Sequence, residues 1–172
     1  CAMKAHINVS KVQEEGCAAI MNLASNNDAN RLSIAGKNGI EAIVSAMMAH
    51  SNVSKVQEWG CGALGNLARN NDANRVSIAA KHGIEAIVSA MTAYNSAPKV
   101  QESGSFALFN LSSNESVSVR IKLLGGFAVL EQNPSKTVLQ WVRASINLAQ
   151  FFWYRLNILV CELGDLICGR KS

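Results

Sequence analysis

Asparagine side chains that recur at regular intervals are the first candidates for a binding function. Asn22, Asn66 and Asn110 stand 44 residues apart, inside segments that otherwise suit a helix. Asparagine is a poor residue for the middle of a helix, so its repetition needs another reason. Its amide offers a donor and an acceptor, either to the backbone of a bound peptide or to a loop of the neighbouring repeat. The sequence leaves both interpretations open.

Cysteine and histidine also recur at equivalent positions, which raises the question of a metal site. The pairs are Cys17 with Cys61 and His6 with His50. Their spacings fit no zinc pattern, and a cysteine repeated on a helix is typical of a small core residue. The Asn-Asn-Asp-Ala-Asn segment at 26–30 lacks the glycine and the final glutamate of a calcium loop, so it indicates a turn and a helix cap. We therefore expect no metal and no cofactor.

Motifs and composition argue against catalysis and against nucleic acid. The sequence has no glycine-rich phosphate loop, no nucleophile motif and no paired carboxylates on one helix face. The net charge is +4, and its one basic cluster is Arg170-Lys171. The five cysteines are an odd number, without a CxxC pair or a secretory signal, which favours a reduced compartment, cytoplasmic or nuclear. We predict a protein that is not an enzyme.

A repeat of 44 residues organises the chain. Residues 6–49 align with residues 50–93 without a gap, and 34 of the 44 positions are identical. A third copy is recognisable up to Asn110-Leu111, and a weaker fourth includes Asn147. We predict a repeat domain at 1–150, with a partial repeat at 1–9 and units that start near residues 10, 54, 98 and 135. Because the first residues match the end of a repeat, we expect a fragment of a longer array.

Hydrophobic spacing predicts a short, a medium and a long helix in each unit. The short helix is expected at Ala29–Lys37, with Asp28 as its N-cap. The medium helix follows a sharp turn at Gly39, and the long helix is expected at Lys11–Ala24. No unit can bury its apolar face alone, so the units must stack. The predicted buried positions are Val12, Gly16, Ala19, Ile20 and Leu23 on the long helix, and Ile40, Ile43, Val44, Met47 and Met48 on the medium helix.

These features resemble the armadillo family. The marks are Val-Gln-Glu leading to Asn-Leu-Ala on the long helix (Val12 to Ala24, Val56 to Ala68), and the Asn-Arg…Gly-Ile-Glu-Ala-Ile segment. The resemblance covers residues 1–150 and is most specific for residues 6–93. It implies an all-α, right-handed solenoid whose long helices line a concave groove, and a scaffold that binds a protein or an extended peptide there. The alternative is a structural segment of a larger solenoid whose partner contacts lie elsewhere.

The resemblance also implies which residues bind. The family's asparagine typically bonds the backbone of an extended peptide, and it carries over to Asn22, Asn66, Asn110 and Asn147. Nuclear-import receptors of the family place a tryptophan four residues before that asparagine. This chain has Ala18, Gly62, Phe106 and Arg143 at those positions, which argues against recognition of a basic nuclear-localisation peptide.

Helical spacing predicts the rest of the groove lining, because positions 4, 7 and 11 residues before each asparagine share its face. Trp59 is either an exposed aromatic anchor or a side chain lying over an apolar neighbour, and Phe106 is expected to be half-packed core. A row of lysines runs beside a row of glutamates, which leaves the sign of the groove open. The lining comprises Lys11, Glu15, Ala18 and Asn22; Lys55, Trp59, Gly62 and Asn66; Lys99, Ser103, Phe106 and Asn110; and Lys136, Gln140, Arg143 and Asn147.

Residues 151–172 leave the repeat pattern. Their apolar stretch, which begins at Phe151-Phe152-Trp153-Tyr154, is interrupted by Arg155, Glu162 and Asp165. It is too short and too broken for a membrane span. The segment is either a cap that covers the last repeat or translated sequence from outside the reading frame of the repeats.

Overall fold

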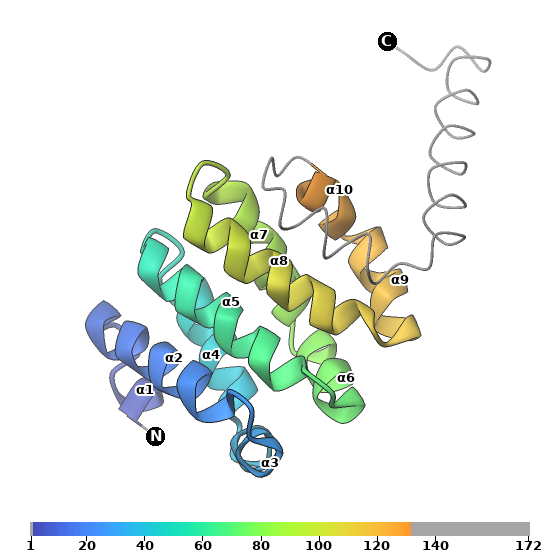
Figure 1. Cartoon of the computed structure of the whole chain (residues 1–172). Helices are drawn as coiled ribbons and strands as arrows, with labels where there is room; N and C mark the ends of the chain where they lie inside the picture. Colours follow the sequence, from blue (N-terminus) through green and yellow to red (C-terminus); the bar gives the residue numbers. More distant parts are fainter. Residues whose placement is uncertain (1, 132–172) are drawn as a thin grey trace, which may run out of the picture.

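The computed structural model of this chain describes residues 2–131, and every regular element in that range is an α-helix (Figure 1). The all-α class predicted from the sequence is therefore confirmed for these residues. The predicted fourth unit near residue 135, Asn147 and the segment 151–172 lie outside the described residues. The helices are α1 (Ala2–Ala5), α2 (Ser10–Ala24), α3 (Asp28–Gly36), α4 (Gly39–Ala49), α5 (Ser54–Ala68), α6 (Asp72–Ala80), α7 (Gly83–Ala93), α8 (Pro98–Ser112), α9 (Glu115–Leu123) and α10 (Gly126–Glu131).

The three longest helices form one layer. Figure 1 shows α2, α5 and α8 side by side, and α5 contacts both of its neighbours. Helices α1, α4 and α7 lie behind them, while α3, α6 and α9 gather at one end of the layer. The long helices begin at Ser10, Ser54 and Pro98, where the sequence places the starts of the units. The order short, medium, long is seen in α3–α4–α5 and again in α6–α7–α8.

The short helices begin one residue earlier than expected, and Asp28 is not their N-cap. The N-cap is Asn27, whose Oδ1 accepts a hydrogen bond from the Asn30 N–H at 3.0 Å. Asp28 is the first helical residue, and its Oδ1 pairs with Arg31 Nη1 at 2.5 Å. The Asp28 carboxylate is therefore the ion partner of the buried Arg31 side chain, while the Asn27 side chain caps the helix.

The turns before α4 and α7 are made by residues other than glycine, whereas Gly125 (φ 74°) makes the turn before α10. Asn38 (φ 59°) and His82 (φ 62°) hold the left-handed conformation, so the prediction that Gly39 supplies the turn is wrong. Gly39 is instead the first residue of α4, and a Cβ atom there would lie 2.7 Å from the Ile34 carbonyl oxygen. Glycine is needed at this position because the chain passes too close to the preceding helix for any side chain.

A pair of glycine substitutions tests this difference. A Cβ at Gly36 would meet nothing within 4 Å, and the equivalent residue in the next unit is Ala80. Gly36→Ala should therefore raise the free energy of unfolding by about 0.5–1 kcal/mol, because alanine loses less backbone entropy on folding. Gly39→Ala should lower it by about 1–3 kcal/mol, because the added methyl group must displace Ile34. Urea denaturation of both variants measures the two shifts, and a stabilised Gly39→Ala would contradict the close approach.

The core lies between the layer of long helices and the layer behind it. Ile40, Ile43, Val44 and Met47 of α4 are buried as predicted, whereas Met48 is 59% exposed. Helix α4 packs against α5 and against α7, and Met48 lines a hollow that it shares with residues of α7.

Long helix α2 is less buried than expected, for a reason that depends on its place in the row. Leu23 is 56% exposed and Ala19 is exposed, although both were predicted to be buried. Their counterparts on α5, Leu67 and Ala63, are completely buried. Helix α5 lies between two long helices, whereas within residues 2–131 α2 has a long-helix neighbour on one side.

A repeated contact between methionine and glycine joins each long helix to the helix before it. A Cβ atom on Gly60 of α5 would lie 2.6 Å from Met47 Cγ of α4, so the methionine occupies the space that glycine leaves. The same contact recurs between Gly104 of α8 and Met91 of α7. It is also found between Gly16 and Met3, on α2 and α1. The small residue predicted to permit close packing on the long helix therefore has a specific partner.

Candidate functional site

The predicted lining residues lie on the side of the long helices that faces away from α4 and α7. Gly60 faces α4, and position 62 lies about 200° further around the helix. A Cβ atom on Gly62 would meet Met21 of α2 and Ser103 of α8, so α5 contributes the middle of this face. We call it the long-helix face, and its members in the described residues are Lys11, Glu15, Ala18, Asn22, Lys55, Trp59, Gly62, Asn66, Lys99, Ser103, Phe106 and Asn110.

The three described asparagines differ in their hydrogen bonds. Asn22 is exposed and its side chain bonds to no other residue in the range 2–131. Asn66 Nδ2 donates to the Met21 carbonyl oxygen at 2.8 Å, which ties α5 to the last turn of α2. Asn110 is nearly buried, and its Nδ2 donates to Phe106 O within its own helix at 3.0 Å. Asn66 therefore makes a hydrogen bond to the neighbouring unit, as one of the two interpretations of the repeated asparagine expects. Its acceptor lies on the neighbouring long helix rather than in a loop.

The two aromatic side chains on this face are half-buried. Trp59 packs against the hydrophobic core but keeps part of its surface exposed, so it has features of both predicted alternatives. The Phe106 ring lies against α5, where a Cβ atom on Gly65 would be 2.6 Å from its Cδ1. Phe106 is therefore half-buried as expected, but its ring lies against α5 and it is not among the partly buried residues packed against the core.

The charged residues that α2 and α5 contribute to the face are paired within their own helices. Lys11 Nζ lies 2.9 Å from Glu15 Oε1 and 3.2 Å from Glu14 Oε1, and hydrogen bonds to Glu15 and then to Glu14 raise the pKa of Lys11. Lys55 Nζ lies 2.8 Å from Glu58 Oε2 and 5.2 Å from the centre of the Trp59 ring. On α5 the charges of Lys55 and Glu58 therefore cancel, whereas on α2 the two glutamates outnumber the one lysine and leave a net charge of −1.

A buried glutamine on each long helix is a structural residue that sequence reasoning missed. Gln57 Nε2 donates to the carbonyl oxygens of Met47 and His50, both at 2.9 Å, at the end of α4. Gln13 and Gln101 make the equivalent pair of bonds to the ends of α1 and α7. The available signal was the recurrence of a polar residue in all three copies of Val-Gln-Glu.

The repeated arginine also holds neighbouring helices together. Arg75 is nearly buried, and its Nε donates to the Asn110 carbonyl oxygen at 2.8 Å, while its Nη1 contacts Asp72 Oδ1 at 2.7 Å. Arg31 makes the same ion pair with Asp28, and its Nε donates to the Ala24 carbonyl oxygen at 3.2 Å. The Asn-Arg motif is therefore explained by contacts between helices.

The repeated histidine and cysteine positions serve packing. His50 Nε2 lies 2.6 Å from the Ile7 carbonyl oxygen, and Tyr94, which stands at the same place in the next unit, donates from its hydroxyl to Ser51 O at 3.0 Å.

Burial raises the pKa of Cys17 and of Cys61 to about 12, so both remain neutral thiols of low reactivity. In the described part of the chain, no three His, Cys, Asp or Glu side chains are grouped to hold a metal ion.

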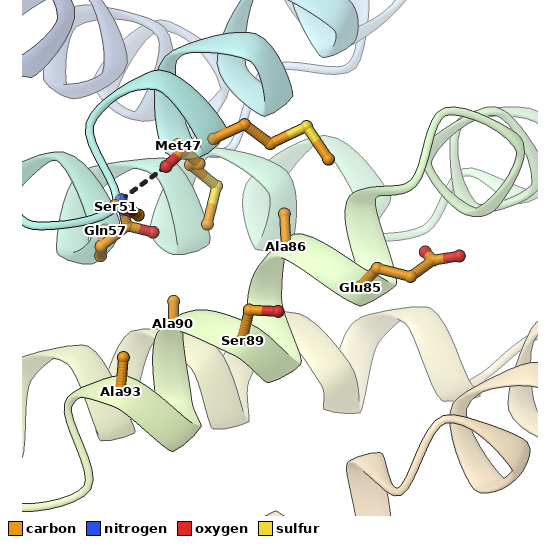
Figure 2. A pocket seen from close by; sticks show the side chains of 9 residues that line it. Met47, Ser51, Gln57, Glu85, Ala86, Ser89, Ala90 and Ala93 are labelled. Atoms are coloured by element: carbon orange, nitrogen blue, oxygen red, sulfur yellow. Dashed lines mark hydrogen bonds between the residues drawn. The ribbon is translucent and has the colours of Figure 1, made fainter.

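A shallow hollow of about 310 Å³ lies between α4 and α7, behind the long helices. Figure 2 shows small side chains of α7, including Ala86 and Ala90, along one side of it, with Glu85 pointing away. Burial raises the pKa of Glu85, but hydrogen bonds from Arg120 at 2.6 Å and from His82 more than offset it and leave the pKa below its usual value. Glu85 is therefore an ionised partner of Arg120 and a weak general base. The complete lining is Met47, Met48, Ser51, Gln57, Glu85, Ala86, Ser89, Ala90 and Ala93.

None of the helices within residues 2–131 combines the length and the apolar character needed to cross a bilayer. No family model matches the sequence, and no curated protein matches it significantly. Among solved structures, the chain is similar to the crystal structure of an engineered protein from the Northeast Structural Genomics Consortium, with 29% sequence identity and a TM-score of 0.70. The similarity covers 80% of this chain and 56% of that protein.

Proposed function

We propose that this chain is an armadillo-type, right-handed α-solenoid that binds an extended segment of a partner protein across the long-helix face. The observation that carries the proposal is the placement of Asn22 and Asn66. Asn66 bonds the carbonyl of the residue before Asn22, so the two amides lie close together on adjacent helices. Asn22 offers its whole amide, and Asn66 keeps its Oδ1 and its second amide hydrogen for a ligand.

The other exposed residues of the face support the same function. Trp59 leaves part of its indole accessible between α2 and α8, and aromatic side chains of this kind often dominate binding energy. Glu15, Lys55 and Phe106 complete the lining beside it. A backbone segment crossing the three helices would meet an amide on each of the first two and an aromatic ring on each of the last two.

A peptide-array screen with asparagine variants tests this function. Asn22→Ala should change the free energy of unfolding by less than about 0.5 kcal/mol, because the side chain is exposed and unbonded. It should weaken binding of the enriched motif about tenfold, as expected for loss of a hydrogen-bonded amide. Asn95→Ala, in the exposed loop before α8, is the matched control and should leave binding unchanged.

Asn66→Ala separates the two roles of the repeated asparagine. It should weaken binding and also lower the free energy of unfolding by about 1 kcal/mol, because it removes the bond to Met21. If the motif bound equally well to wild type, Asn22→Ala and Asn66→Ala, the long-helix face would not be the binding site. The chain would then be a structural segment whose partner contacts lie elsewhere.

A further inference from the structure

The position of Lys55 on the long-helix face is fixed by a buried carboxylate. The side chain of Glu58 is 10% exposed, and its Oε2 lies 2.8 Å from Lys55 Nζ. A carboxylate removed from water to this extent is costly unless a cation stays beside it. Glu58 therefore holds the Lys55 ammonium where it lies, 5.2 Å from the centre of the Trp59 ring.

In this arrangement the ammonium of Lys55 already makes a cation–π contact with the ring of Trp59. The face of an indole attracts one positive charge, and Lys55 supplies it from within the same helix. A lysine or arginine from a ligand would have to displace Lys55 to take the same place over the ring. Lys55 and Glu58 also cancel each other, so the cluster offers no net charge to an acidic ligand.

The side chains that meet the middle of α5 from its two neighbouring helices are uncharged, while Glu15 of the same face is paired with Lys11 on α2. Met21 from α2 reaches the Cβ position of Gly62 at 2.7 Å, and Ser103 Oγ approaches the same point from α8 at 3.9 Å. Met21, Ser103 and Phe106 are each half-buried, like Trp59 itself. Together they form a strip across α5 that presents a thioether, a hydroxyl and two aromatic rings.

We propose that Lys55 makes the long-helix face selective: it accepts segments whose side chains are apolar and uncharged where they meet Trp59, and it rejects basic segments. This inference rests on the function proposed above and names the chemistry of the ligand. The selectivity does not come from a pocket of one shape. It comes from a lysine of the protein that occupies the place a ligand cation would otherwise take.

Two libraries of ten-residue peptides test the proposal. One carries apolar side chains at alternating positions, and the other carries lysine or arginine there. The full chain is screened against both, and dissociation constants of the best peptide from each library are measured by fluorescence anisotropy. The wild-type protein should bind the best apolar peptide at least about tenfold more tightly than the best basic peptide. The Trp59→Ala variant should bind the same apolar peptide about twentyfold less tightly than wild type does, as for a hot-spot aromatic residue.

Changes at Lys55 should alter the preference in a defined direction. Lys55→Met frees the indole face and leaves Glu58 without its cation, so binding of the basic peptide should strengthen at least about tenfold. Lys55→Arg keeps the cation and should keep the rejection. If Lys55→Met does not fold, the double variant Lys55→Met/Glu58→Gln removes both charges, and it should still bind the basic peptide about threefold more tightly than wild type does.

The outcomes distinguish this inference from the proposed function. If wild type binds basic peptides as tightly as apolar ones, or if neither Lys55→Met nor the double variant improves basic binding, the selectivity of Lys55 is disproved and the binding face stands. If no peptide from either library binds wild type, the proposed function fails, and the inference fails with it.

Discussion

Replacing Ile87 with alanine is expected to lower the free energy of unfolding by about 2–5 kcal/mol, through lost burial and the cavity that remains. Ile87 is completely buried on α7, in the continuous core between the long helices and the layer behind them. Helix α7 packs against α4, α8 and α10. These contacts hold α7 in place, so the helices cannot easily move together to fill the cavity that the substitution leaves. Urea denaturation followed by circular dichroism at 222 nm measures the change.

Val76→Ala on α6 is the control for this experiment. Val76 is also an aliphatic helix residue, but it is 50% exposed. Its loss should change stability by less than about 0.5 kcal/mol. Equal effects of the two substitutions would show that α7 does not lie in the core as described.

Replacing Gln57 with leucine is expected to lower the free energy of unfolding by about 2–3 kcal/mol, although it makes the core more apolar. The Met47 carbonyl lies in the last turn of α4, where no backbone N–H of the helix reaches it, so it would lose its partner. The His50 carbonyl would keep its bond from the Val53 N–H at 3.0 Å. The cost should therefore correspond to one unsatisfied buried carbonyl and one weakened acceptor.

Asn52→Leu provides the matched comparison for the glutamine. Asn52 lies in the exposed loop between α4 and α5, and its side chain makes no hydrogen bond to the described residues. The same urea experiment should show a change below about 0.5 kcal/mol. A Gln57→Leu protein as stable as wild type would mean that the two bonds do not hold α5 against the end of α4.

Much of the fold could be predicted from the sequence because one pattern was repeated almost without change. The long helix was expected at Lys11–Ala24 and is Ser10–Ala24, since apolar periodicity marks both of its ends. The capping residue could not be chosen in the same way. Asn27 and Asp28 are adjacent and both are good caps. In the structure Asn27 caps the helix and Asp28 pairs with Arg31, whose burial the sequence did not reveal.

The candidate site was less predictable, because its properties depend on contacts between helices. Helical spacing placed Asn66 on the correct face, but its bond to Met21 depends on how closely α2 and α5 approach. The Lys55–Trp59 contact had a local signal, since residues four apart on a helix are neighbours. The reason why Lys55 stays beside the ring became visible only with the burial of Glu58, which depends on how the neighbouring helices pack around α5.

The glutamine and methionine contacts recur every 44 residues, and this has a consequence for how the gene can change. Gln57 stands ten residues after Met47, and Gln101 stands ten residues after Met91. Recombination that removed residues 50–93 would place Gln101 ten residues after Met47 and Gly104 opposite that methionine, with Tyr94 in the place of His50. Each junction would then be made by residues that already form it elsewhere in the chain. Unequal crossing-over can therefore shorten or lengthen this protein by whole units. In each product, the helices at the new junction pack through the same residue contacts that join the existing units.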